Sequence, residues 1–261
     1  MAPSIPVIES SLTTPRVRRI TFDQPWEWLA AGWRDTWKTP FASLCYGLLF
    51  VVMGYYLTAM VRERFHLALA LTTGFLLVGP FLAMGLYDLS RRLEKREPAT
   101  LLASLFAWRG NTMAILLFGI VIGLIMIVWA RLSALLFAAI LLSSTPAVDS
   151  TTADIFFSGD GLKFLIVFIA VGAVLAGLVF TISVVSIPML LDRKIDFITA
   201  VLTSITAVRA NPGPMFLWAA LIVTFTGVGL ATFYLGLAIT MPLIGHATWH
   251  AYRALVEPEQ P

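Results

Sequence analysis

Charged residues are scarce in this sequence. Asp, Glu, Lys and Arg make up only 13% of its 261 residues, whereas 59% are hydrophobic. Soluble domains carry about 25% charged and about 45–50% apolar residues. A soluble fold of this length would need more polar side chains to cover its surface. The composition therefore predicts a protein whose surface faces lipid.

Cysteine and histidine are also rare. The single cysteine, Cys45, lies inside an apolar run, so the chain can form neither an intrachain disulfide nor a cysteine-based metal cluster. There are only three histidines. The sequence contains no phosphate loop, no nucleophile triad, no paired acid–base carboxylates and no nucleic-acid motif. We therefore expect neither an enzyme nor a nucleic-acid-binding protein.

Long apolar runs are what the sequence does contain. A helix needs about 20 apolar residues to cross a bilayer. Such runs predict spans at 42–61, 66–87, 112–142 and 164–191. The last run, 214–252, has no charged residue and is long enough for two spans, at 214–231 and 234–252, joined by a turn near Ala231–Tyr234. Because lipid cannot satisfy open strands, the predicted fold class is all-α, a polytopic transmembrane bundle of six spans.

The basic residues set the orientation of these spans. If the chain crosses the membrane six times, most of its 18 Lys and Arg residues lie in segments on the same side as the N-terminus. The segment 143–162 carries Asp149, Asp154 and Asp160 but no basic residue. The positive-inside rule then predicts that both termini are cytoplasmic in a multi-pass protein of the bacterial inner membrane. We expect a flexible tail over 1–25, a membrane domain over 26–256 and a short tail over 257–261, with anionic membrane lipids as partners.

An internal repeat supports six spans. Similar openings occur at 31–34, 107–111 and 207–212, and the segment 80–91 resembles 242–253. Each copy is predicted to be an amphipathic interfacial helix followed by two spans. The helices are either structural collars or surfaces that dock lipids or partners. Their apolar stripes comprise Trp26, Leu29, Ala30, Trp33 and Trp37 in the first copy, and Ile198, Val201, Leu202, Ile205 and Val208 in the third.

A few ionisable residues are candidate functional groups, because charge is costly in lipid. They are Asp88, Arg131, Arg34, Arg109 and Arg209. Arg131 lies near the predicted outer end of its span, where it either reaches the headgroups or binds an anion or the external aspartates.

Two histidines form the one candidate metal site. His246 and His250 are four residues apart, so they share one helix face, which suits a metal or haem iron. Asp88 corresponds to His250 in the repeat and is the candidate third ligand. The alternative is that both histidines bond to headgroups or to neighbouring helix ends. We expect no cofactor, with haem or metal binding as the alternative.

Several motifs resemble one family. They are Arg18-Arg19-Ile20, the segment PWEWLAAGWRD at 25–35, GPF at 79–81, GLYDLSR at 85–91, ANPGP at 210–214 and GHATWHAYR at 245–253. Over about residues 16–256 the chain is similar to the bacterial membrane proteins called domain of unknown function 2189. The resemblance implies an inner-membrane protein, and the label cytochrome c oxidase subunit on some members implies a respiratory association.

Three histidines are too few for a catalytic oxidase subunit. The resemblance therefore favours a non-enzymatic accessory or assembly protein that binds membrane partners, among them other proteins of a respiratory complex. The alternative is a small transporter or lipid-handling protein.

Overall fold

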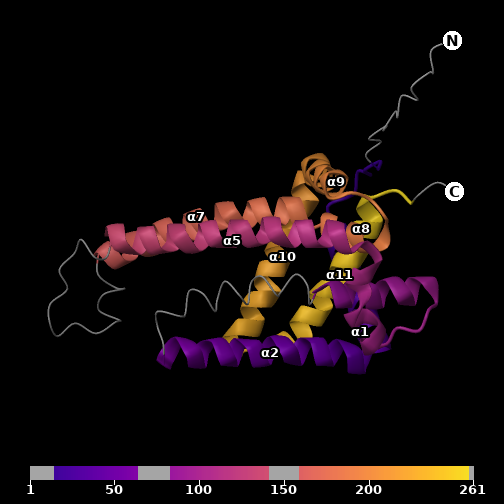
Figure 1. Cartoon of the computed structure of the whole chain (residues 1–261), viewed down its shortest axis with the longest axis horizontal. Coiled ribbons are helices and arrows are strands. Elements are labelled where there is room, and N and C mark those ends of the chain that lie inside the picture. Colours follow the sequence, from indigo (N-terminus) through magenta and orange to yellow (C-terminus); the bar gives the residue numbers. More distant parts are fainter. Residues whose placement is uncertain (1–14, 64–82, 141–158, 259–261) are drawn as a thin grey trace, which may run out of the picture.

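The computed structural model describes residues 15–63, 83–140 and 159–258, and these residues are almost entirely helical (Figure 1). Their only β element is an isolated bridge between Val17 and Val256. The all-α fold class is therefore confirmed. A further helix at 83–95 accompanies the labelled elements, which are α1 (Gln24–Lys38), α2 (Pro40–Glu63), α4 (Leu101–Leu105), η1 (Ala107–Asn111), α5 (Thr112–Ile140), α7 (Gly159–Ser183), α8 (Ser186–Asp192), α9 (Phe197–Ala210), α10 (Pro212–Ala231) and α11 (Leu237–Leu255).

Four helical stretches in the described residues are long and apolar enough to cross a membrane. They are Pro40–Ala59, Ala107–Ile140, Gly159–Asp192 and Pro212–Ala231. They overlap the spans predicted at 42–61, 112–142, 164–191 and 214–231, which confirms an integral membrane protein with several apolar helices. The span predicted at 66–87 lies mostly outside the described residues. The one at 234–252 coincides with α11, which is not among the four, so six spans stay a prediction.

The turn expected near Ala231–Tyr234 is present between α10 and α11. Phe233 and Tyr234 both have positive φ angles, of 54° and 68°. Such backbone is unfavourable for aromatic residues, so the turn needs support from its neighbours. The Thr232 hydroxyl accepts a hydrogen bond from the Gly236 N–H at 2.9 Å. The Tyr234 hydroxyl lies 2.8 Å from Oγ1 of Thr58 on α2, which ties the turn to a third helix.

Both ends of the described chain lie together at one end of the molecule (Figure 1). The Arg18 N–H donates to the Leu255 carbonyl at 2.8 Å, and the Glu257 N–H donates to the Arg16 carbonyl at 3.0 Å. Arg16 and Arg18, in the segment expected to be a flexible tail, are thus hydrogen-bonded to the end of α11 and the residues that follow it.

The span predicted at 164–191 is divided into α7 and α8. Pro188 lies in the first turn of α8, where backbone N–H groups have no partner within the helix, so its missing N–H is tolerated there. Side chains from α9 bridge the break. Ser204 Oγ accepts a hydrogen bond from the Val185 N–H at 3.2 Å and donates to the Thr181 carbonyl at 2.7 Å.

Helix α9 turns small or polar residues inward and large apolar residues outward, and α1 exposes three of its four tryptophans although Trp28 is buried. Helix α9 buries Thr199, Ala200, Thr203, Ser204 and Ala207, whereas Ile198 and Leu202 are exposed. In α1, Leu29 of the predicted stripe is buried, but Trp26, Trp33 and Trp37 are exposed. A helix in water shows the opposite pattern. Lipid around these helices accounts for it, because small and polar residues serve helix contacts within a membrane.

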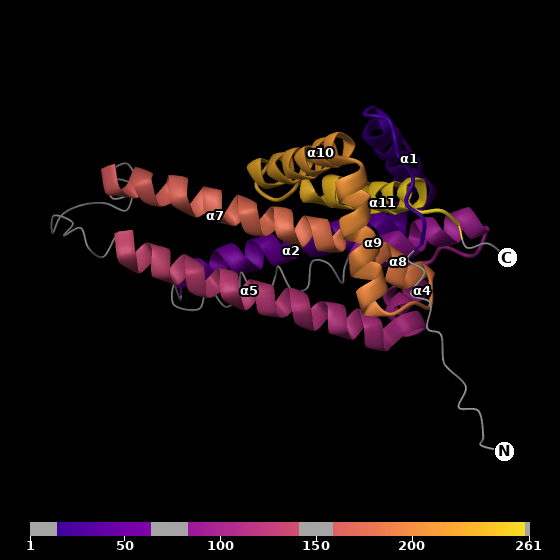
Figure 2. The same cartoon turned by 90° about the horizontal axis from the view of Figure 1, so that it is seen from above.

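Helix α11 is the centre of the bundle. It packs against α1, α2 and α10 (Figure 2), and Trp249, Tyr252 and Leu255 are almost completely buried. Two glycines permit this close packing. A Cβ on Gly32 of α1 would lie 2.7 Å from the Ala247 nitrogen, and one on Gly47 of α2 would lie 2.1 Å from the Ala238 carbonyl oxygen.

Candidate functional site

The two histidines of α11 meet at a carboxylate of α1. His250 Nε2 lies 2.7 Å from Asp35 Oδ2, and Ser90 Oγ donates to the same oxygen at 2.8 Å. Ser90 Oγ also lies 2.7 Å from His246 Nδ1, and Ser43 Oγ lies 2.9 Å from His246 Nε2. We call these five residues, Asp35, Ser43, Ser90, His246 and His250, the polar joint. It links α1, α2, helix 83–95 and α11.

The hydrogen bonds fix the direction of donation along the polar joint. An ionised carboxylate can only accept, so Ser90 donates its single hydroxyl proton to Asp35. Ser90 must then accept from His246 Nδ1–H, and in a neutral imidazole Nε2 accepts from Ser43. Both ring nitrogens of His246 are thus occupied.

Burial is nearly complete along the polar joint except at His250. Asp35 is 6% exposed and His246 is 0% exposed, whereas the His250 side chain is 28% exposed. Burial by itself raises the pKa of the Asp35 carboxyl, but hydrogen bonds from His250 and Ser90 outweigh it and hold the pKa below its ordinary value of 3.8. Asp35 is therefore ionised at neutral pH.

An open cleft of about 300 Å³ lies beside the polar joint. Asp35, Ser90 and His250 form one wall. Arg253 and Glu94 form another, and their ion pair has an Nε–Oε1 distance of 3.0 Å. The Trp249 indole N–H donates to the other Glu94 oxygen at 3.0 Å, so this wall is held by the core of α11. The remaining lining residues are Lys38 and Leu93.

Asp88 does not reach the histidines, although the repeat made it their candidate partner. It is 0% exposed, and its two carboxylate oxygens accept from Arg91 Nε at 2.9 Å and from Arg92 Nε at 2.6 Å. Both arginines lie one helical turn further along the same helix, so the carboxylate is satisfied locally. The carboxylate that the histidines do meet is Asp35.

The histidine pair has no open metal-binding set around it. Among residues 15–63, 83–140 and 159–258, no three His, Cys, Asp or Glu side chains are placed to hold a metal ion. A metal or haem on His246 would have to displace a serine hydroxyl from one of its ring nitrogens. Haem or metal binding stays a prediction that this arrangement does not favour.

The four candidate arginines are separate and exposed. Arg34 lies on α1, Arg109 on η1 and Arg209 on α9, and the Arg109 guanidinium stacks 4.3 Å from the Phe106 ring centroid. Arg131 lies on α5 and makes no ion pair within the described residues. Of its predicted partners, Asp160 is paired with Lys163 at 3.0 Å, and Asp149 and Asp154 lie outside the described residues.

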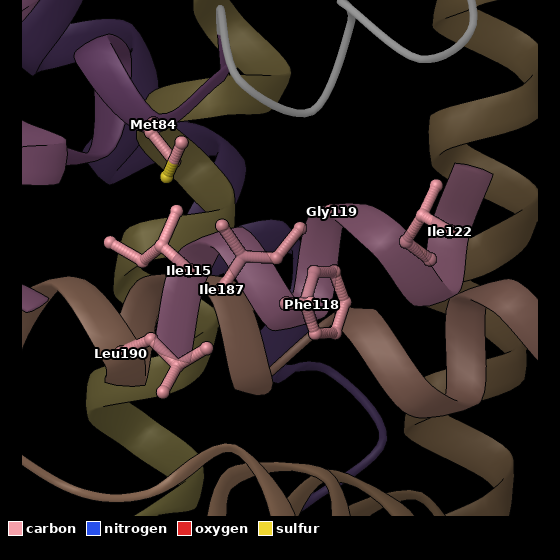
Figure 3. A pocket seen from close by; sticks show the side chains of 7 residues that line it. All are labelled: Met84, Ile115, Phe118, Gly119, Ile122, Ile187 and Leu190. Carbon is pink, nitrogen blue, oxygen red and sulfur yellow. The ribbon is translucent and has the colours of Figure 1, made fainter. Parts of the chain in front are cut away.

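Two apolar cavities lie inside the bundle. The smaller one, of about 10 Å³, is lined only by apolar residues of helix 83–95, α5 and α8 (Figure 3). It has room for about one water molecule but offers no polar partner to hold one. The larger one, of about 530 Å³, is bordered mainly by apolar side chains such as Phe50, Trp129 and Phe180. Neither of these two cavities is lined by the charged residues that line the cleft beside the polar joint.

Sequence reasoning identified the histidines but missed Asp35, Ser43 and Ser90. A signal for Asp35 exists, since it follows Trp28 and Gly32 on one face of α1, and all three are buried. A carboxylate on the packed face of an amphipathic helix requires an internal partner. The serines carry no comparable signal, because small hydroxyl residues are common in membrane helices.

Comparison with known proteins gave a family match, and that match agrees with a chain of apolar helices. No curated protein and no solved structure matches the chain. A family model described as predicted integral membrane protein (DUF2189) matches residues 67–192. The family resemblance of the sequence is thereby confirmed: across residues 67–192 the chain matches the family of predicted integral membrane proteins DUF2189.

Proposed function

We propose that the protein is a non-enzymatic accessory protein of the bacterial inner membrane, and that it binds membrane partners at the end of the molecule where its chain ends lie. The observation that carries the proposal is the pair of opposite faces on α1. Asp35 on one face is locked to α11 through the polar joint. The other face exposes Trp26, Trp33 and Trp37. A rigidly held row of tryptophans suits a surface that docks at the membrane interface.

The basic residues near this row support the same assignment. Arg34 and Lys38 are exposed beside the tryptophans, and Arg16, Arg18 and Arg19 are exposed in the segment that leads into α1. Clusters of this kind are attracted to the anionic cytoplasmic leaflet. We therefore assign this end of the molecule, with both chain ends, to the cytoplasmic side.

Six spans in three repeats are part of the proposal, and two asparagines support them. The Asn211 amide donates to the Arg18 carbonyl at 2.9 Å, and its oxygen accepts from the Ile20 N–H at 2.8 Å, in the segment that precedes α1. The Asn111 amide donates to the Ile195 carbonyl at 2.9 Å, in the segment that precedes α9. Each asparagine lies at the end of the opening segment of one repeat. Its side chain hydrogen-bonds the segment that precedes the first helix of another repeat.

Partner binding can be tested by gentle solubilisation of the tagged full chain from its native membrane, followed by identification of the co-purified proteins. We expect other membrane proteins, with respiratory complexes among them, to co-purify. The double variant Trp33→Ser/Trp37→Ser should lose them. Phe233→Ser, which removes another exposed aromatic ring in the α10–α11 turn, should retain them. A protein that purifies alone in mild detergent would contradict the proposal.

Lipid handling is the second candidate, because the cavity of about 530 Å³ has an apolar lining suited to an acyl chain. Lipid extraction and mass spectrometry of the purified protein would test it. Met241→Trp narrows this cavity and should reduce the bound lipid, whereas equal lipid content in both proteins would rule out this role.

A further inference from the structure

Within the described residues, one oxygen of Asp35 has no hydrogen-bond donor. Its Oδ2 accepts from both Ser90 and His250. The closest cation to Oδ1 in the described chain is Lys38 Nζ at 3.9 Å, which is too long for a hydrogen bond. An ionised, nearly buried carboxylate with an unfilled oxygen favours a donor of positive charge in the cleft.

Two cations beside the same cleft have donors to spare. The Lys38 side chain is 61% exposed, and in the described chain its only ion pair is the long one with Asp35. Arg253 uses Nε and one terminal nitrogen on Glu94, while its other terminal nitrogen lies 3.6 Å from Asp192. The cleft therefore offers one acceptor for a cation and two donors for an anion.

We propose that this cleft binds a phosphoethanolamine group, with its primary ammonium on Asp35 Oδ1 and its phosphate between Lys38 and Arg253. A ligand with only a negative charge would be repelled by the carboxylates of Asp35 and Glu94. A ligand with only a positive charge would be repelled by Lys38 and Arg253. A ligand that carries both charges satisfies both sets. A primary ammonium also fits better than a trimethylated one, because only the former can donate a hydrogen bond to Oδ1.

The membrane supplies the more direct source of this group, a phosphatidylethanolamine headgroup. Lys38 lies at the end of α1 beside Trp37 and Phe41, which are 64% and 74% exposed. These rings would contact the glycerol and acyl region of the lipid while its headgroup lies in the cleft. This step rests on the proposed placement of α1 in the membrane interface, but it does not require a protein partner.

The test uses the full chain, first stripped of lipid in detergent and then placed in nanodiscs of phosphatidylglycerol alone or mixed with phosphatidylethanolamine or phosphatidylcholine. Native mass spectrometry measures the lipid retained, and the thermal unfolding midpoint measures stabilisation. We expect retention of phosphatidylethanolamine over phosphatidylcholine and a higher midpoint in its presence. Asp35→Asn and Lys38→Gln should each weaken retention about tenfold, as expected for loss of one charge-assisted hydrogen bond.

The chain offers a control in Asp160 and Lys163, a carboxylate–lysine pair with the same spacing on α7, in which both side chains are exposed and the carboxylate is not buried as Asp35 is. Asp160→Asn and Lys163→Gln should leave retention unchanged. If Asp35→Asn fails to fold, the exposed Lys38→Gln still decides the matter. Stabilisation by free phosphoethanolamine alone would identify a soluble source, and stabilisation by the lipid alone would identify the membrane.

Equal retention of phosphatidylethanolamine and phosphatidylcholine by the wild type, or unchanged retention in Lys38→Gln, would overturn the site. That result is distinct from failure of the proposed function, which is measured by co-purified proteins.

Discussion

His250 Nε2 lies 2.7 Å from Asp35 Oδ2, although the two residues are 215 positions apart in the sequence. This contact joins α11, the last described helix, to α1, the first. With Ser90 and His246 it forms a buried polar connection at the end of the molecule where the chain ends meet. We expect it to stabilise the bundle as well as to shape the cleft.

Replacement of His246 by Ala should be among the more destabilising single changes in the chain. It leaves a cavity at a fully buried position and removes one hydrogen-bond partner from each of the hydroxyls of Ser43 and Ser90. The expected loss is about 2–4 kcal/mol of unfolding free energy in a detergent titration. His250→Ala, at a partly exposed position, should cost about 1–2 kcal/mol. An equal loss in the two variants would show that His246 is not the buried centre of the joint.

Gly47→Ala should separate α2 from α11. The added Cβ would lie 2.1 Å from the Ala238 carbonyl oxygen, and backbone cannot move aside as a flexible side chain does. The expected loss is about 1–3 kcal/mol. Gly227→Ala on α10 is the control, because a Cβ there meets nothing within 4 Å. That change should be neutral or stabilising by up to about 1 kcal/mol, through helix propensity. Similar unfolding midpoints for both variants would contradict the close α2–α11 contact.

Local features of this fold were predictable from the sequence, whereas long-range partners were not. The apolar run 214–252 predicted the α10–α11 hairpin and its turn, because a run twice the length of one span must fold back. The break between α7 and α8 involves hydrogen bonds from Ser204 of another helix, which the sequence of the span alone does not show. Asp35 was missed because the predicted stripe of α1 was defined by Trp26, Trp33 and Trp37, and these face outward. A stripe pattern shows that a helix has two faces, but the surrounding medium decides which face packs inward.

Asn211→Ala should release the segment that precedes α1. The buried Asn211 side chain holds Arg18 and Ile20, and loss of its hydrogen bonds should cost about 1–3 kcal/mol. Limited trypsin digestion measures this directly, because Arg16, Arg18 and Arg19 are cleavage sites in that segment. Cleavage there should accelerate about tenfold or more.

Asn111→Ala is the matched comparison for Asn211. It should accelerate cleavage at Arg193 and Lys194, next to the Ile195 carbonyl that Asn111 binds, and should leave the N-terminal sites as protected as in the wild type. Identical digestion patterns for the two variants would contradict the separate roles assigned to the two asparagines.

The most direct test of the central claim is the sidedness of the α10–α11 turn relative to the chain ends. In a Cys45→Ser background, cysteine is placed at the exposed Thr232 of the turn or at Glu94 beside the cleft, and intact cells are labelled with a membrane-impermeant thiol reagent. We expect labelling of Thr232→Cys in intact cells and of Glu94→Cys only after the membrane is opened, with tags on both chain ends also inaccessible from outside. Labelling of both cysteines from the same side would contradict it.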